Sequence, residues 1–288
     1  MKKKQSPSSI ICFERCKREY YYRYILNLPI KPSIHLVKGN VVHYSLELFY
    51  NKYYDNLNDY METCFEQSLV KYKKDIEELD LTEEQYQTEK QDMFNILDLY
   101  LRLVHIKLSY YVSSGKASSL SHAFHYIKPK FKELWLEDEG MNLCGKIDRV
   151  MEDYSGRVTI TDYKTSNRYG TEIRDEYELQ GALYALLFKL TRNIVPHRFI
   201  VSYLRFGIEY GTRITPTLIE EAISVVNRVN EHTENTDISF YPKTEGKFCE
   251  HCSYFEECSG ISKAKSDIRK KKVLEELGKT TVTPVQSS

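Results

Sequence analysis

Residues 145–166 read GKIDRVMEDYSGRVTITDYKTS, and they combine two short strand-like runs with a turn and a set of charged side chains. The run is β-branched and aromatic in character and contains the turn signal Tyr154-Ser-Gly, so it predicts two antiparallel strands. Residues two apart on a strand point to the same face, so Asp162 and Lys164 project together. The turn folds the first strand back, which allows Asp148 to approach them.

Strand-like and helical patterns continue on both sides of this hairpin. The runs at 124–136 and 197–206 are rich in β-branched and aromatic residues and predict further strands. Residues 174–191 and 215–232 carry helical patterns, and the second has Pro216 in its first turn. The predicted fold class is therefore α/β (α+β), with a central sheet and flanking helices.

The N-terminal part of the chain is predicted to be helical. Ser6-Pro7-Ser-Ser is a natural helix start for residues 6–26, and apolar residues recur at helical spacing from Gly39 to about Tyr54. Residues 59–113 are charged and carry long helical periodicity. We interpret about 55–118 as a helical insertion of two or three helices.

The composition describes a soluble, globular chain of 288 residues with 41% hydrophobic and 28% charged residues. A formal net charge of zero neither supports nor excludes a nucleic-acid partner, because only the local field at a site matters. No apolar run reaches the roughly 18 residues of a membrane span, and the basic N-terminus lacks the apolar segment of a secretion signal. A cytoplasmic protein with no membrane partner is expected, in which thiols serve as ligands rather than disulfides.

The paired charges point to metal chemistry. Two carboxylates, Asp148 and Asp162, beside Lys164 suit a hard divalent cation such as Mg²⁺ or Mn²⁺. Such an ion lowers the pKa of a bound water, and a lysine can orient that water or screen developing charge. The alternative is a pair of solvated carboxylates with Lys164 as their salt-bridge partner. Their place at the end of the strand VTIT favours a functional site.

Two helical segments carry further candidates. Gln180 and Tyr184 lie four residues apart and share a helix face, from which both can hydrogen-bond a phosphate or a base. The alternative places Tyr184 in the core and Gln180 at its rim. His43 lies among apolar residues, where a histidine is either a core residue or a neutral metal ligand.

The order of these motifs resembles the RecB-like branch of the PD-(D/E)XK nucleases, which have a restriction-endonuclease-like fold. The matching motifs, in chain order, are Gly39-x-x-x-His43, Gly145-x-x-Asp148, Asp162-Tyr163-Lys164 and Gln180-x-x-x-Tyr184. The resemblance implies that His43, Asp148 and Asp162 bind the catalytic metal and that Lys164 assists the attacking water. It implies DNA contacts for Gln180 and Tyr184. Glu133, on the preceding strand, is a candidate for a further acidic contributor.

The cysteines form a second constellation. Cys249, Cys252 and Cys258 lie close together, and a fourth ligand must come from elsewhere. The segment around Cys16 resembles the opening of iron–sulfur nucleases in this superfamily, including CRISPR-associated RecB-like exonucleases, AddB-type nucleases and exonuclease V, although Lys17 stands where they often have proline. The resemblance implies a structural [4Fe–4S] cluster on these four thiolates, with zinc as the alternative.

The patterns along the chain also predict a domain organisation. A single nuclease domain is expected over 1–278, with its core at about 120–240, its cysteine region at 248–260 and a disordered tail at 279–288.

Four basic residues near Cys16 either line a path for a single strand or form a solvated helix face. These residues are Arg15, Lys17, Arg18 and Arg23.

Three function classes compete. The first is a DNA exonuclease that acts on single-stranded ends and leaves a 5′-phosphate and a 3′-hydroxyl, with any helicase, recombination or CRISPR partner on a separate chain. The second is a non-catalytic nucleic-acid-binding or scaffold subunit of a repair, replication or CRISPR adaptation complex. The retained His43, Asp148, Asp162 and Lys164 favour the enzyme. The third, a redox protein, lacks a flavin or nicotinamide fingerprint.

Overall fold

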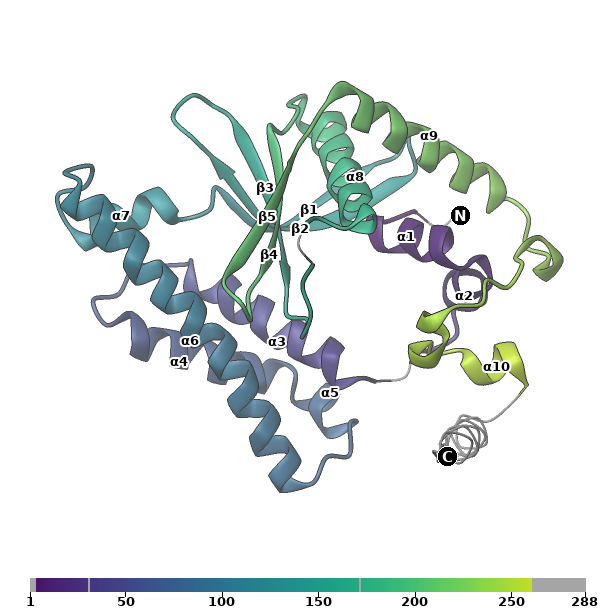
Figure 1. The fold of residues 1–288 in the computed structure, drawn as a ribbon, viewed down its shortest axis with the longest axis horizontal. Coiled ribbons are helices and arrows are strands. Elements are labelled where there is room, and N and C mark those ends of the chain that lie inside the picture. Colours follow the sequence, from purple (N-terminus) through teal and green to yellow (C-terminus); the bar gives the residue numbers. More distant parts are fainter. Residues whose placement is uncertain (1–3, 31, 171, 261–288) are drawn as a thin grey trace, which may run out of the picture. The chain divides into compact units, whose positions relative to one another are not determined.

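The computed structural model describes residues 4–30, 32–170 and 172–260 (Figure 1). The chain divides into two compact units. The first comprises Met1–Ile11 and Pro32–Glu234, and the second comprises Cys12–Lys31 and Asn235–Ser288. The single domain expected over 1–278 stays a prediction, and the predicted tail at 279–288 lies outside the described residues. No helix in the described part of the chain is both long and apolar enough to cross a membrane.

The first unit is built on a mixed sheet of five strands in the order β1-β2-β3-β4-β5. β3 and β4 are parallel, and the other neighbours are antiparallel. The strands are β1 Phe131–Asp138, β2 Leu143–Glu152, β3 Val158–Lys164, β4 Arg198–Tyr203 and β5 Ile208–Arg213. The predicted mixed α/β fold with a central sheet and flanking helices is confirmed.

Helices cover both faces of this sheet (Figure 1). One face packs against a helical layer whose apolar side chains join Tyr163 of β3 and Leu204 in a single core. That layer contains α3 Ile34–Phe49, α4 Leu57–Lys71, α5 Lys73–Glu77, α6 Glu83–Ser113 and α7 Leu120–Ile127. α8 Asp175–Arg192 packs on the other face, and α9 Pro216–His232 packs on α8. Three helices, α4 to α6, lie between 57 and 113, and their interpretation as an insertion over about 55–118 stays a prediction.

Local sequence signals set several helix ends. The Ser33 side chain accepts a hydrogen bond from the Leu36 amide at the start of α3. At the start of α6, Thr82 and Gln85 form a reciprocal capping box. α9 begins with Pro216 after a Thr215 cap, as its sequence predicts. These polar caps satisfy backbone groups that the helix itself leaves unpaired.

One prediction of secondary structure was wrong, and one strand was not predicted. The strand expected from residue 124 is instead α7, because Phe124 turns into the core of the helical layer and packs on Phe49. The strand begins only at Phe131, beyond Pro129. β5 was not predicted, and it pairs with β4 through a turn at Gly207, whose φ is 64°. Partner strands such as β5 are stabilised by pairing, which a short sequence window does not reveal.

The second unit is assembled from two distant segments. The first contributes α2 Lys17–Tyr20 and the π-helical turn Tyr21–Ile25, which follow α1 Pro7–Arg15. The other contributes short turns at Ile238–Phe240 and Lys247–His251 and the helix α10 Phe255–Ser259. Tyrosines join them: Tyr20 stacks on Tyr241, and the Tyr254 hydroxyl donates to the Leu28 carbonyl at 2.9 Å. Most of this unit's aromatic side chains therefore serve packing.

Candidate functional site

Asp148 lies where the two strands of the hairpin separate. The β2–β3 ladder runs from Glu152 and Val158 up to Arg149 and Thr161, and it ends there although both strands continue. Just beyond that point, Asp148 Oδ2 accepts a hydrogen bond from the Tyr163 amide at 2.7 Å. The buried carboxylate thus takes the place of the next backbone partner and stays at the junction.

His43 reaches the same junction from α3. One ring nitrogen, Nδ1, lies 3.4 Å from Asp148 Oδ1, and the other, Nε2, lies 3.1 Å from the Tyr163 carbonyl oxygen. Contacts on both ring nitrogens hold the imidazole in a fixed orientation. The structure therefore brings together His43 and Asp148, which are 105 residues apart in the sequence.

Glu133 on β1 completes a compact group. One ligand atom each from His43, Glu133 and Asp148 lies within 4.8 Å of the others. The Glu133 backbone has a φ of 46°, which is rare for a residue with a Cβ and interrupts the extended strand. Its carboxylate also forms an ion pair with Lys146. Such backbone outliers concentrate at functional sites, where surrounding structure enforces them.

Asp162 and Lys164 form a second group with α8. Lys164 Nζ lies 2.7 Å from Asp162 Oδ2, as expected for two residues on one strand face. Gln180 joins them, since its Nε2 donates to Asp162 Oδ1 at 2.9 Å and its Oε1 accepts from Lys164 at 3.1 Å. The Tyr184 hydroxyl lies 3.4 Å from the same Nε2. The predicted glutamine–tyrosine pair thus lies beside the predicted acid and lysine.

The four acidic and imidazole groups perturb one another. Burial raises the pKa of Asp162 and Glu133, and Asp148 raises both further. Burial also acts on Asp148, but His43, the Tyr163 amide and Lys164 outweigh it and hold the pKa of Asp148 below its usual value. Burial alone would lower the pKa of His43, yet the neighbouring carboxylates raise it to about 9. Several negative groups in a water-poor site are the setting that a divalent cation stabilises.

The donor set fits such a cation. Carboxylate oxygens with one imidazole nitrogen are ligands that Mg²⁺ and Mn²⁺ accept. The three donors within 4.8 Å of one another belong to His43, Glu133 and Asp148. Asp162 contacts Lys164 and Gln180. Its negative charge also raises the pKa of His43, and Asp148 raises the pKa of Asp162. From the sequence, Glu133 was predicted only as a candidate further acidic residue. Its unusual φ turns it toward the site, and no local sequence pattern indicates that backbone conformation.

A basic hollow of about 420 Å³ adjoins the carboxyl end of β3. Thr165 and Ser166, which directly follow Lys164, line it together with Arg168 and Arg174. Asn167 and, from α3, His35 and Lys38 complete the lining. Lys38 is ion-paired with Glu89 and Asp92, so the arginines carry most of the positive charge. Cations and hydroxyls beside an acidic site are suited to phosphate oxygens on either side of a scissile bond. No sequence pattern predicted this hollow, although Arg168 and Arg174 closely follow the Asp-x-Lys triplet.

The four predicted cluster ligands all belong to the second unit. Cys16 is buried, and Cys249, Cys252 and Cys258 are half-buried. Burial raises the pKa of the Cys252 and Cys258 thiols, and the neighbouring Cys16 raises the pKa of both further. No three of the described cysteines bring their sulfurs within 4.8 Å of one another. A cluster or a zinc ion on these four cysteines stays a prediction.

The predicted DNA-binding residues of the N-terminal segment have partners within the second unit. Arg15 forms a 2.8 Å ion pair with Glu19, and Arg18 Nε donates to the Tyr241 carbonyl at 2.7 Å. Lys17 and Arg23 lie over the rings of Phe13 and Tyr24. A role for these four residues in binding DNA stays a prediction.

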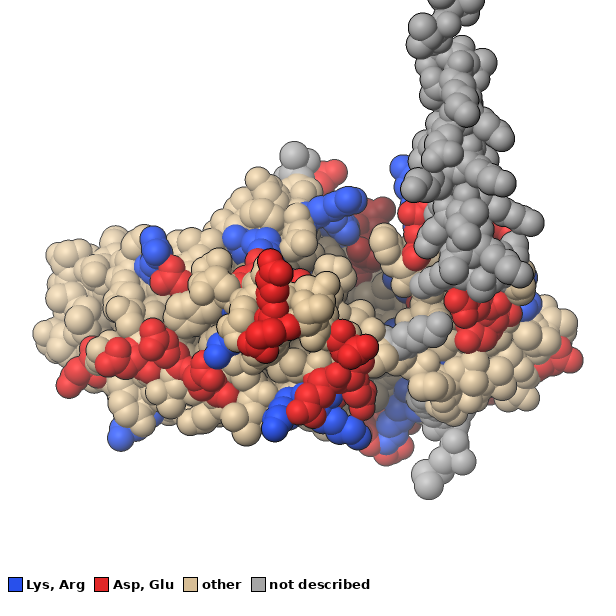
Figure 2. Space-filling view, turned by 90° about the horizontal axis from the view of Figure 1, so that it is seen from below, with Lys and Arg blue, Asp and Glu red and all other residues tan. Residues whose placement is uncertain are grey.

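The face shown in Figure 2 carries both acidic and basic side chains, and the acidic ones form the longer continuous runs. The formal net charge of the whole chain is zero. Attraction for a polyanion therefore depends on local groups such as the basic hollow rather than on the whole surface.

Comparisons with known proteins place this geometry in a family. A solved structure from Eubacterium rectale, described as a "Putative exonuclease", matches with a TM-score of 0.52 and 15% identity over 88% of each chain. At that identity, the likeness shows the fold. No curated protein matched the chain. The family model of the PD-(D/E)XK nuclease superfamily matches residues 4–259, which include every candidate site residue. This chain therefore belongs to the PD-(D/E)XK nuclease superfamily.

Proposed function

We propose that the chain is a metal-dependent DNA nuclease of the RecB-like branch, acting as an exonuclease on single-stranded ends. The observation that carries the proposal is the convergence of Asp148, Asp162, Lys164 and His43 where β2 and β3 separate. The description of the Eubacterium rectale protein as an exonuclease agrees with it. The basic hollow next to Lys164 offers a path for the strand.

The residues divide the work by position. His43, Asp148 and Asp162 would hold Mg²⁺ or Mn²⁺, and Glu133 lies close enough to His43 and Asp148 to contribute. When bound, the cation acts as a Lewis acid and lowers the pKa of water at the site. Lys164 keeps a raised pKa beside Asp162 despite its burial, so it stays protonated and stabilises negative charge on the phosphate.

Gln180 is a positioning residue in this proposal. Its amide contacts Asp162 and Lys164 at the same time, which fixes the distance between carboxylate and ammonium. Tyr184 in turn contacts the Gln180 amide. A carboxylate and an ammonium that are already held in place reduce the reorganisation that the reaction requires.

The second unit is proposed to hold a structural [4Fe–4S] cluster on Cys16, Cys249, Cys252 and Cys258. Four thiolates from two distant segments would tie those segments together, and such a site requires a reducing compartment such as the cytoplasm. Any helicase, recombination or CRISPR partner would be a separate chain.

The test is a nuclease assay on anaerobically purified protein with end-labelled single- and double-stranded DNA, with and without Mn²⁺. We expect Mn²⁺-dependent loss of the end label, faster on single strands, and at least about a 100-fold loss of rate in Asp162→Ala and Lys164→Ala. Asp98→Ala is the matched control, because Asp98 is an exposed carboxylate paired with Arg102 on α6. Full activity of the Asp162 and Lys164 variants would refute the proposal and favour a non-catalytic scaffold.

A further inference from the structure

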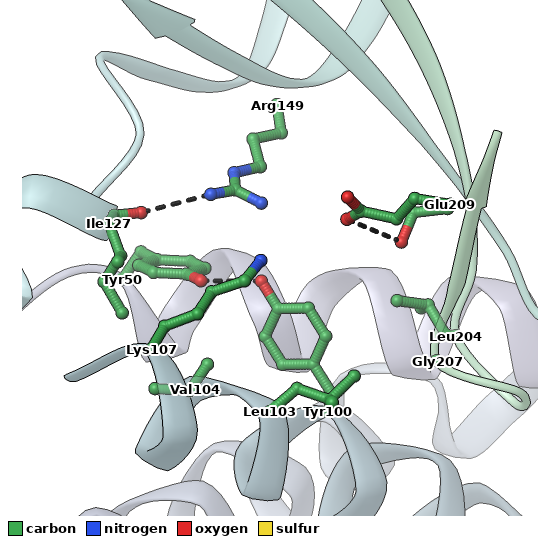
Figure 3. A pocket seen from close by; sticks show the side chains of 11 residues that line it. Tyr50, Tyr100, Leu103, Val104, Lys107, Ile127, Arg149, Leu204, Gly207 and Glu209 are labelled. Atoms are coloured by element: carbon green, nitrogen blue, oxygen red, sulfur yellow. Dashed lines mark hydrogen bonds between the residues drawn. The ribbon is translucent and has the colours of Figure 1, made fainter. Parts of the chain in front are cut away.

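A separate cavity of about 200 Å³ lies in the first unit, between the sheet and α6 (Figure 3). Aromatic and aliphatic side chains form much of its wall, among them Tyr50, Tyr100 and Leu204. The charged side chains of Arg149, Lys107 and Glu209 point toward its interior in Figure 3. The cavity is therefore mainly apolar, with a few charges that face one space.

Arg149 is the unusual member of this lining. The residue is 9% exposed, and its Nη2 donates to the Ile127 carbonyl at 3.2 Å. Its Nε has no hydrogen-bond partner, and within the described ranges no carboxylate oxygen lies within 4.0 Å of the guanidinium. A buried guanidinium with a donor left unpaired has a place for an anionic acceptor, and such an acceptor offsets part of its desolvation cost.

The neighbouring phenols do not neutralise this charge. Burial raises the pKa of Tyr50 and Tyr100 well above 10, so both hydroxyls stay protonated. The Tyr50 and Tyr100 hydroxyls lie 2.6 Å apart, and the Tyr50 ring lies 5.8 Å from the guanidinium carbon. The Tyr50 ring and the Glu209 carboxylate attract the Arg149 charge, but among the described residues neither accepts a hydrogen bond from its guanidinium.

The cavity is distinct from the acidic site although it uses the same strands. Arg149 follows Asp148 on β2, and successive strand residues point to opposite faces. Tyr163, between Asp162 and Lys164 on β3, likewise belongs to the core on the helical side and lies 3.3 Å from the Tyr100 hydroxyl. Asp148, Asp162 and Lys164 thus point to the opposite face of the sheet from Arg149 and Tyr163.

We propose that this cavity binds the carboxylate of a small organic acid with a compact apolar body. Arg149 and Lys107 contribute two positive charges and Glu209 one negative charge, which leaves one charge for a monoanion to balance. A phosphate dianion would place a second negative charge near Glu209. The planar guanidinium matches a carboxylate, and the aliphatic and aromatic walls accommodate the body.

Calorimetric titration of the whole chain with benzoate, acetate and inorganic phosphate tests the proposal. We expect saturable 1:1 binding of benzoate, weaker binding of acetate because it fills less of the apolar wall, and still weaker binding of phosphate. Lys107→Gln should weaken benzoate binding about fivefold, and Glu209→Gln should tighten it by a similar factor. Lys90→Gln, the same change on α6 at a residue outside the cavity lining, should leave binding unchanged.

Arg149→Met should abolish benzoate binding while the chain still folds, because an apolar side chain of similar length replaces an unpaired buried charge. Far-ultraviolet circular dichroism and a melting curve check its fold, and if it does not fold, the opposite shifts of Lys107→Gln and Glu209→Gln decide. The proposal is overturned if the parent does not bind benzoate, if phosphate binds more tightly, or if Lys107→Gln and Glu209→Gln fail to shift affinity in opposite directions. None of these measurements depends on nuclease activity.

Discussion

Asp148 performs a structural and a chemical task with a single carboxylate. Its Oδ2 accepts from the Tyr163 amide, and its Oδ1 faces His43. The first contact replaces a lost ladder bond between β2 and β3, and the second belongs to the proposed metal site. The Tyr163 amide needs only a hydrogen-bond acceptor at position 148, whereas a metal cation needs a negatively charged ligand there.

Asparagine and alanine at position 148 should therefore behave differently. Asp148→Asn keeps an acceptor for the Tyr163 amide, so we expect near-parental stability with at least about a 100-fold lower cleavage rate. Asp148→Ala should in addition lower the free energy of unfolding by about 1–3 kcal/mol, because it leaves a buried amide unpaired. Urea unfolding and end-label release measure the two effects. Equal cleavage by Asp148→Asn and the parent would contradict the assignment.

Glu133 illustrates strain retained at a functional site. At a φ of 46°, glycine has no Cβ to clash, so Glu133→Gly should be about 1 kcal/mol more stable than Glu133→Ala. Both variants lack the carboxylate and should bind Mn²⁺ more weakly than the parent. Thermal unfolding and Mn²⁺ titration measure these differences, and an alanine variant as stable as the glycine variant would argue against backbone strain.

At the scale of the elements, the packing of α8 on β4 sets the position of Gln180. A Cβ at Gly181 would lie 2.4 Å from the ring of Phe199, which real contacts do not allow. Helix propensity alone would favour alanine there by about 1 kcal/mol, but overpacking costs about 1–3 kcal/mol. We expect Gly181→Ala to destabilise the chain and to lower activity by displacing Gln180. Urea unfolding that shows a gain in stability would contradict this account.

An ion-pair cluster joins α6 to α3 and to the turn after β4. Asp92 contacts Arg205 and Lys38. The hydrogen bonds from Arg205 have the largest effect, and together with Lys38 they hold the pKa of Asp92 far below its usual value despite partial burial. Because the pKa of Asp92 is lower in the folded chain than in the unfolded chain, its charge stabilises the fold at pH values above the unfolded-state pKa. This stabilisation is lost as the pH falls from the unfolded-state pKa through the folded-state pKa.

Asp92→Asn should therefore be less stable than the parent at pH 7. The difference should shrink progressively below about pH 4, where the unfolded carboxyl becomes protonated. Urea unfolding across this pH range measures it, with Asp98→Asn as a control on the exposed face of the same helix. A difference that stays constant down to pH 2 would exclude this electrostatic origin.

At the scale of the whole molecule, the proposed cluster joins chain segments that are more than two hundred residues apart. Cys16→Ser should abolish the broad absorbance at about 400 nm and lower the iron content of anaerobically purified protein. Cys64→Ser is the matched control, because Cys64 is buried in the first unit among apolar residues. One zinc per chain without this absorbance would replace the cluster with a zinc site.

The sequence by itself determined the features that depend on local periodicity. A strand period of two placed Asp162 and Lys164 together, a helical spacing of four placed Gln180 beside Tyr184, and polar caps marked helix starts. The order of these motifs also indicated the superfamily that the comparisons show. Each of these signals lies within a few residues, where covalent geometry dictates direction.

Only the tertiary structure decided the contacts that arise from long-range pairing. The separation of β2 from β3, the approach of His43 to Asp148 and the turned backbone of Glu133 depend on neighbours far along the chain. The same holds for α7, whose aromatic side chains are covered by the helical layer, and for β5, which pairs with β4. Side-chain burial and strand partners are properties of the packed chain, and no local window of sequence contains them.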